Sequence, residues 1–385
     1  MSFNVAEKEL LDYSQNHGLL YKSFVNVLPE SYYQGYSTVF MTAMRPEFQW
    51  LYQGEIPTKI QDTISLGTCV RTNGGFSKEV LSDRHLKTFE MLMFCSARPY
   101  KESLPMAIDL IQKLLQEKGK LYARVFPTDV MSKEILASNK ISFIDNDDCI
   151  FSGEKHQTNR SGFRIEFCAK GTLPSGKTVD WELMNTVLIN SINGVPLDRP
   201  LLESAGCFER FLVFREGVDS VFETSSFNLT KMRNLLPDAT KQQVFTLADL
   251  VRTAVMLSLS GYADCPKESR QNKTFSIVLT NLANFGVLNR FSQRDIDDIM
   301  AYEFSLIQQR KNVTDDEVMQ YKKGCFLARE KLAQKEIAYR KICQYLNADK
   351  MMPMNTRIEK AAKRYNGGDL DFVTKIVNTQ FRGRE

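Results

Sequence analysis

Apolar residues recur with helical spacing between residues 102 and 118, where Ile108, Ile111 and Leu115 share one face with neighbouring apolar side chains. This spacing predicts an amphipathic helix, and weaker helical spacing predicts a second one near the N-terminus. Short apolar runs, continuous or alternating, predict strands instead. In the N-terminal part we expect helices at 4–18 and 102–118, and strands at 121–126, 141–150, 163–169 and 181–192. Strands that are separated by helices and long loops, with antiparallel pairs, predict an α+β fold.

The pattern changes after a polar, linker-like stretch at residues 228–244. From Thr246 onward nearly every apolar position follows a helical period. Ser292 and Thr314 are suited to be helix N-caps, with Asp295 and Asp315 in the first turns behind them. We therefore expect two domains, 1–235 and 236–385, of which the second is all helical, with helices at 246–260, 273–286, 293–309, 315–345, 355–365 and 368–380.

Composition adds few constraints. The chain has 385 residues, a formal net charge of +4 and 43% hydrophobic residues, which are ordinary values for a globular protein. No apolar run approaches 18 residues, and the N-terminus lacks the apolar core of a signal peptide. Eight cysteines without a CxxC pair, and three histidines, make a structural zinc site unexpected. We expect a cytoplasmic protein with reduced thiols, without zinc and without a membrane partner.

The segment 63–101 contains the residues best suited to chemistry. An apolar run ends in Cys69-Val70-Arg71, a polar loop follows, and a second apolar run comes after Arg84 and His85. Two strands joined by a polar loop, with an arginine at the end of the first, are suited to hold a triphosphate. The guanidinium group bonds phosphate oxygens in pairs and keeps its charge at every physiological pH.

The same segment resembles a known family. The letters CVRTNGG…RHLKTFEML are similar to the motif 2 region of alanyl-tRNA synthetases. Residues 39–54 resemble a segment upstream of motif 2, residues 182–187 (ELMNTV) resemble a later strand, and residues 202–210 (LESAGCFER) resemble motif 3. The four segments keep the family's order over residues 1–215. The resemblance implies a class II synthetase-like antiparallel sheet flanked by helices, followed by the all-helical domain, without the family's editing and C-terminal domains.

By this resemblance one group of residues binds ATP. Arg71 and Arg210 are the expected catalytic residues, with Arg71 on the α-phosphate and the substrate carboxylate and Arg210 on the γ-phosphate. His85 is expected to bond a pyrophosphate oxygen, and Phe89 to stack on adenine. Each of these residues also has a structural alternative, as a surface arginine, a structural histidine or a core phenylalanine. The implied ATP site is Arg71, Arg84, His85, Phe89, Glu90, Glu182 and Arg210, with Glu182 also the candidate ligand of Mg²⁺.

The implied amino-acid site departs further from the family. Glu203 stands where motif 3 has an aspartate that binds the substrate ammonium, and Ala205 and Cys207 replace two glycines. The segment 152–166 keeps almost none of the residues that close on the amino acid. The resemblance therefore leaves the identity of the amino acid open. The implied amino-acid site is Met91, Asn185, Glu203, Ala205 and Cys207.

In the helical half, Asp249 and Arg252 match family positions, but the family's arginine-rich helix is replaced by residues 270–286, where most cations are absent. Because phosphate neutralisation dominates nucleic-acid affinity, we expect weak tRNA binding or none at this helix. A later helix does carry cations, which more often mark a solvated face than an RNA contact. These cations are Lys322, Lys323, Arg329, Lys331, Lys335, Arg340 and Lys341.

Three functions remain open. The first is ATP-dependent activation of an amino acid as an aminoacyl-adenylate, with transfer to a non-tRNA acceptor such as a small-molecule amine, a carrier protein or a peptide. The second is a minimal enzyme that aminoacylates tRNA. The third is a non-catalytic relative that binds or regulates a partner.

Overall fold

The computed structural model describes residues 2–28, 62–71, 82–151, 160–348, 352–367 and 369–380, with the side chains of Ser2 and Arg199 left out. The segment 39–54, which resembles the family upstream of motif 2, and the polar loop after Arg71 lie outside these residues. The chain divides into two compact units, and Asn228 and Leu229 lie on either side of the division. The boundary at 235/236 stays a prediction.

The first unit is built on one sheet, which has nine strands among the described residues. The order is β1-β2-β3-β9-β8-β7-β4-β5, and β6 pairs with β7. The pairs β1–β2 and β4–β5 are parallel, and the other pairs are antiparallel. The strands are β1 (Leu20–Phe24), β2 (Thr63–Val70), β3 (Thr88–Ser96), β4 (Lys120–Val125), β5 (Ser142–Asp145), β6 (Ile150–Phe151), β7 (Arg160–Thr172), β8 (Thr178–Ile192) and β9 (Val195–Cys207). This sheet confirms the predicted α+β class.

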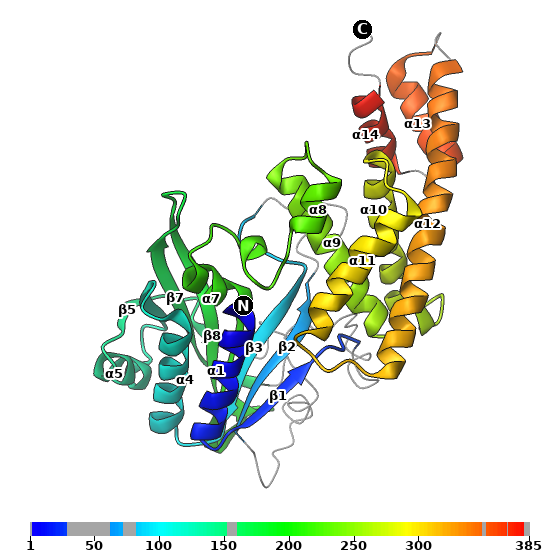
Figure 1. The fold of residues 1–385 in the computed structure, drawn as a ribbon. Helices are drawn as coiled ribbons and strands as arrows, with labels where there is room; N and C mark the ends of the chain where they lie inside the picture. The colour runs from blue at the N-terminus through cyan, green and yellow to red at the C-terminus, as the bar shows by residue number, and fades with distance from the viewer. Residues whose placement is uncertain are drawn as a thin grey trace. The chain divides into compact units, whose positions relative to one another are not determined.

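Helices cover one face of the sheet (Figure 1). Helix α1 (Ser2–Asn16) packs on β1 and β2, α4 (Tyr100–Leu115) on β9, and α7 (Phe208–Glu216) on β3 and β8. The rings of Phe3 and Phe208 meet edge to face at 5.3 Å, and those of Trp181 and Phe214 at 6.1 Å. These aromatic contacts pack α1 against α7 and α7 against β8. We call this side the covered face. Helix α5 (Val130–Ser138) packs beside β4, β5 and α4.

The hairpin of β8 and β9 is held by a two-residue turn. Asn193 and Gly194 both have positive φ, at 52° and 74°, as a type I′ turn requires. Further along β9, a Cβ atom at Gly206 would lie 2.1 Å from the carbonyl oxygen of Leu183. A side chain cannot fit there, so glycine is what lets β8 and β9 approach at this point.

The second unit is all helical in its described residues, as predicted. Helix α9 (Lys241–Leu259) is buried along nearly its whole length and packs on α10 (Arg270–Leu288), α11 (Gln293–Gln308) and α12 (Asp315–Ala348). Ser292 caps α11 in a capping box with Asp295, and the Thr314 hydroxyl accepts from the backbone N–H of Glu317, so both predicted caps are confirmed. The remaining helices of this unit are α8 (Thr230–Leu235), α13 (Met354–Tyr365) and α14 (Leu370–Gln380), with the short 3₁₀ turn η3 (Tyr262–Asp264). A second 3₁₀ turn, η2 (Val221–Glu223), follows α7 in the first unit.

The interpretation of residues 228–244 as a linker was wrong in part. Helix α8 and the start of α9 lie within this stretch, and Thr240 caps α9 through a capping box with Gln243. The polar residues there belong to helix ends and exposed helix faces. None of the helices in the described part of the chain is long and apolar enough to cross a membrane.

Candidate functional site

The face of the sheet opposite the three helices carries a row of aligned side chains. Met93 lies opposite Ala205, Ala205 opposite Asn185, Asn185 opposite Glu166, and Glu166 opposite Arg124. Residues opposite each other on neighbouring strands point to the same side of a sheet. We call this side the motif face, because it carries most of the residues that the sequence singled out.

The residues predicted for the amino-acid half lie together on the motif face. Met91 is directly opposite Cys207, and Glu203 lies two residues from Ala205 on the same strand. Asn185 is opposite Ala205 on β8. Segments nearly 120 residues apart in sequence are thus brought side by side by the antiparallel pairing of β3 with β9.

The first predicted arginine lies at the end of β2. The backbone N–H of Arg71 donates to the carbonyl oxygen of Lys87 at 2.7 Å, which extends the pairing of β2 with β3 by one residue. The guanidinium carbon of Arg71 is 5.5 Å from the ring centroid of Phe89, a cation–π distance. Phe89 is two residues before Met91, so it belongs to the motif face. The side chain of Arg71 is exposed.

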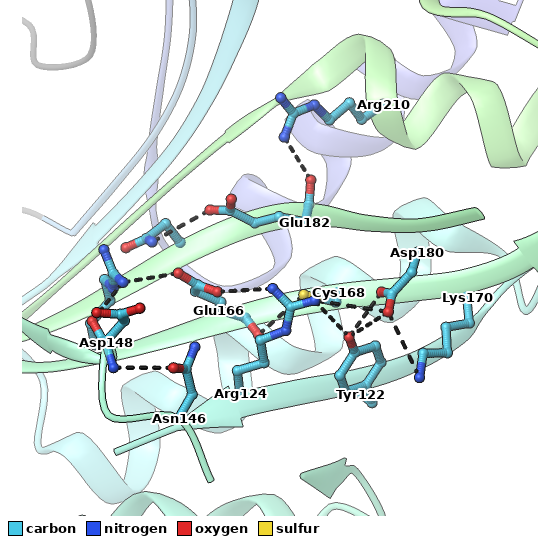
Figure 2. A network of polar contacts seen from close by, with 12 residues as sticks. Tyr122, Arg124, Asn146, Asp148, Glu166, Cys168, Lys170, Asp180, Glu182 and Arg210 are labelled. Carbon is cyan, nitrogen blue, oxygen red and sulfur yellow. Dashed lines mark hydrogen bonds and ion pairs between the residues drawn. The ribbon is translucent and has the colours of Figure 1, made fainter. Parts of the chain in front are cut away.

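The second predicted arginine is held by backbone carbonyl groups from two other segments. Arg210, in the first turn of α7, donates from Nη1 to the carbonyl oxygen of Glu182 at 2.8 Å (Figure 2). Its Nε donates to the carbonyl oxygen of Arg84 at 3.3 Å. The side chain of Asn185 donates to the Glu182 carboxylate at 3.4 Å. These bonds fix the guanidinium group of Arg210 at the end of the motif face that also contains the ends of β2 and β9.

His85 follows Arg84 in the chain and lies close enough to Arg210 to feel its charge. Its Nδ1 is 2.8 Å from the hydroxyl oxygen of Ser82. Partial burial of the ring, and then the positive charges of Arg210 and Arg84, lower the pKa of His85 from its ordinary value of 6.5. His85 still reaches solvent. A bound anion would offset the positive charges of the two arginines, so it would reverse the part of the pKa shift that their repulsion causes.

Glu90 is placed apart from the other ATP-site candidates. It alternates with Phe89 and Met91 along β3, so it points to the covered face. There the Thr68 hydroxyl donates to its carboxylate at 3.0 Å, and its backbone N–H donates to the Glu209 carboxylate. Both acids are buried. Glu90 and Glu209 thus fasten β2, β3 and α7 to one another, on the side away from Phe89.

A polar network that the sequence did not single out continues the motif face over β7 and β4 (Figure 2). The Glu166 carboxylate is paired with Arg124 at 3.4 Å and with Arg164 at 3.0 Å. The Tyr122 hydroxyl donates to Asp180 at 2.8 Å. Burial, and then this bond to a carboxylate, raise the pKa of Tyr122. The alternation of charged residues along β7 could have indicated a polar face on this strand. It could not have indicated their partners, which lie on other strands.

The side chains near Arg210 suit a magnesium–triphosphate better than a protein-only metal centre. The described residues contain no group of three or more His, Cys, Asp or Glu side chains that could hold a metal ion. Mg²⁺ needs only one or two carboxylates when phosphate oxygens complete its shell, and Glu182 can supply one. The residues present therefore fit magnesium only together with a nucleotide.

In the helical unit, the two positions matched to the family lie inside the bundle. Asp249 and Arg252 on α9 are both buried, and Arg252 Nε donates to the Glu303 carboxylate at 2.7 Å. Of the cations on α12, Lys323 pairs with Asp264, and Arg329 is 3.5 Å from Asp297. The buried pair holds α9 to α11, and the cations of α12 are partly neutralised by acids of the same unit.

The position of His85 gives a prediction. If a triphosphate binds between Arg84 and Arg210, its negative charge offsets their repulsion, and the pKa of His85 rises. An NMR titration of the histidine ring with and without ATP and magnesium measures this. His17 is the control, because its Nδ1 lies 2.9 Å from the Tyr13 carbonyl oxygen on α1, which packs on the covered face. A pKa of His85 that stays unchanged while ATP binds would place the triphosphate elsewhere.

Comparison with known proteins gives partial likenesses. No family model and no curated protein matches the sequence. Among solved structures, the chain is similar to the apo histidyl-tRNA synthetase of S. aureus, at 12% identity over 58% of this chain and 68% of that chain, with a TM-score of 0.38. It is also similar to two structures of pyrrolysyl-tRNA synthetase from Desulfitobacterium hafniense. Both are 15% identical, one over 57% of this chain and 70% of that chain with a TM-score of 0.33, and the other over 58% and 73% with a TM-score of 0.31.

Proposed function

We propose that this chain uses ATP to activate the carboxyl group of an amino acid as an aminoacyl-adenylate, and passes the acyl group to an acceptor other than tRNA. The observation that supports this most is the meeting of three distant segments at one end of the motif face. Arg210 from α7 is bonded to the backbone at Arg84 and Glu182, and His85 lies beside them. Arg71 and Phe89 lie at the same end, at the junction of β2 and β3.

The proposed reaction needs positioning and charge neutralisation rather than a covalent intermediate on the protein. A carboxylate oxygen of the acid attacks the α-phosphorus of ATP, and the bond from that phosphorus to the bridging oxygen breaks, which releases pyrophosphate. Arg71 would stabilise the α-phosphate, Arg84, His85 and Arg210 the leaving pyrophosphate, and Phe89 would stack on the adenine ring. When bound, Mg²⁺ would neutralise phosphate charge, with Glu182 as its protein ligand.

Pyrophosphate release tests this function. The purified chain is incubated with ATP, magnesium and each member of a panel of acids, and pyrophosphate is measured against a reaction without acid. The proposal predicts acid-dependent release for at least one acid. Background release with every acid, at a protein concentration that binds ATP, would favour a non-catalytic relative.

Transfer to tRNA is the second candidate, because several cations of α12 are exposed. Lys322, Lys323, Arg340 and Lys341 all reach solvent on this helix. Charging of total tRNA with a labelled acid separates the two candidates. Label that stays acid-soluble, together with pyrophosphate release, supports the non-tRNA acceptor, whereas label on tRNA supports the second candidate.

A further inference from the structure

One side of α12, the long helix drawn in orange in Figure 1, carries exposed apolar side chains in a straight row. Met319, Phe326 and Ile337 are 62%, 52% and 55% exposed. They are seven and eleven residues apart, so at 3.6 residues per turn they lie in line along the helix. We call this side the exposed face of α12. The buried residues of the helix lie on its opposite side and are Tyr321, Gly324, Ala328, Leu332, Ile342 and Leu346.

The charged residues of the exposed face are grouped by sign along the helix. Two acids stand at its start, two cations and one acid follow, and two more cations stand in its last third. Within about 60° of the row, the charged residues are Asp315, Asp316, Lys322, Lys323, Glu330, Arg340 and Lys341, all of them exposed. Lys323 is paired with Asp264 of η3, and Arg340 is 3.9 Å from Glu336. The two acids at the start, and Lys341, form no ion pair within the described part of the chain.

A second copy of α12, laid antiparallel on this face, matches the apolar row to itself. In an interface with two-fold symmetry, a residue that contacts a second residue of the other copy is itself contacted in return. With the axis at the level of Ala328, Met319 lies nine residues before it and Ile337 nine residues after it, so each Met319 meets an Ile337. Phe326 lies two residues before the axis, so the two phenylalanine rings fall near the centre. The exposed apolar side chains of the row are then buried in both copies.

The same axis brings opposite charges together at both ends of the row. Asp315 and Arg340 lie on one flank of the row, thirteen residues before the axis and twelve after it. Asp316 and Lys341 lie on the other flank, twelve residues before the axis and thirteen after it. Two-fold symmetry keeps each flank together, so the residues of each pair meet between copies within one residue step, about 1.5 Å, along the helix. Each end of the paired helices thus gains two contacts between opposite charges.

The same charges disfavour other occupants of this face. In a parallel pair the acidic starts would lie against each other and so would the basic ends, and like charges repel. Nucleic acid would meet three acids among the cations, whereas interfaces for nucleic acid are strongly positive. In the antiparallel pair, Glu330 of one copy instead lies within one turn of Lys323 of the other, on the same flank.

We propose that the exposed face of α12 is the interface of a homodimer, in which α12 packs antiparallel against α12 of a second copy. The apolar rows form the seam, and the acidic start of each helix pairs with the basic last third of the other. Apolar side chains seven residues apart, as Met319 and Phe326 are, are typical of the seam between paired helices. The inference does not depend on the proposed function.

Sedimentation velocity of the full chain measures the dimer. A seam of one helix from each copy is small for a stable complex, so the chain is studied from about 1 to about 100 μM, where the dimer fraction should rise. Ile337→Asp puts a charge opposite Met319 at both symmetric contacts and should raise the dissociation constant at least tenfold. Ile277→Asp is the matched control, because it makes the same change at an isoleucine of α10 that is 51% exposed. A wild-type chain that stays monomeric at the highest concentration, or a dimer that both variants leave equally intact, would overturn the inference.

Charge exchange tests the antiparallel order. One variant carries Asp315→Lys and Asp316→Lys, and a second carries Arg340→Glu and Lys341→Glu. Each variant alone sets like charges together and should associate with itself at least tenfold more weakly than the wild-type chain does. An equimolar mixture restores opposite charges at both ends, so it should form a heterodimer with an affinity within about threefold of wild type. A mixture that associates no better than the separate variants would contradict the antiparallel seam.

Circular dichroism checks the fold of each variant, because acids in the first turn also stabilise a helix. If the chain with Asp315→Lys and Asp316→Lys does not fold, Ile337→Asp and the chain with Arg340→Glu and Lys341→Glu decide. A monomeric chain that binds total tRNA through this face would overturn the inference and favour the tRNA candidate. Sedimentation measures association and not activity, so a failure here leaves the proposed function standing, and a failure of pyrophosphate release leaves the dimer standing.

Discussion

Replacing Arg71 by alanine should lower kcat/KM for adenylate formation by about 10²–10³-fold, because removing one preorganised donor to a developing charge typically costs about 2.7–4 kcal/mol. Arg71 is exposed and its side chain lies over Phe89, so its loss removes a charge from the ligand side of the sheet. The backbone bond of Arg71 to Lys87 does not depend on the side chain. Acid-dependent pyrophosphate release measures the effect.

Two further variants sharpen this prediction. Arg71→Lys keeps a charge but loses the planar pair of donors, so it should recover only part of the rate. Lys101→Ala removes an exposed cation from α4 and should keep the full rate. If Arg71→Ala is as active as Lys101→Ala, the α-phosphate is not held by Arg71 and the proposed site is wrong.

In the helical unit, replacing Glu303 by leucine should destabilise the protein by about 3–5 kcal/mol, because it removes the carboxylate from a buried ion pair. Arg252 and Glu303 are 6% and 1% exposed, and their contact at 2.7 Å joins α9 to α11. Chemical unfolding followed by circular dichroism measures the loss. Glu303→Gln keeps the volume and a hydrogen-bond acceptor, so it should cost less than Glu303→Leu.

The double variant Arg252→Met/Glu303→Leu separates a charge effect from a packing effect. Exchange of a buried ion pair for apolar residues of similar volume is often nearly neutral, so the double variant should be more stable than the Glu303→Leu single variant. Arg294 and Asp298, an exposed pair on α11 at 3.9 Å, provide the control, since exposed pairs contribute about 0–1 kcal/mol. A Glu303→Leu chain as stable as the Asp298→Ala chain would show that the buried pair contributes little.

Local sequence signals predicted the helices well and the long strands poorly. The amphipathic period found α4, and the capping residues Ser292 and Thr314 marked helix starts correctly. Strand β9 was not predicted, because its first half has few apolar residues and contains Pro196 and Pro200. The turn Asn193-Gly194 was a usable hairpin signal, since this dipeptide accepts the positive φ values of a type I′ turn.

For the site, the family resemblance named residues that the fold gathers, but their partners could not be predicted. Met91 and Cys207 face each other, and Arg210 is fixed by carbonyl groups of residues 28 and 126 positions away. The pairing of Arg160 with Glu203 joins β7 to β9 across an intervening strand. Such a contact depends on the register of three strands, which no local spacing reveals. Glu90 was predicted for the ATP site, but it points to the covered face. It is the next residue after Phe89, and successive residues of a strand point to opposite faces.

The central claim is that Arg71 and Arg210 hold one nucleotide together, and calorimetric titration with ATP and magnesium tests it most directly. The wild-type chain should bind ATP, and Arg71→Ala and Arg210→Ala should each weaken binding at least tenfold while circular dichroism shows both variants folded. The loss in the double variant should differ from the sum of the single losses, because the two groups contact one ligand. Wild-type affinity in both single variants, or no binding of ATP by the wild-type chain, would contradict the account.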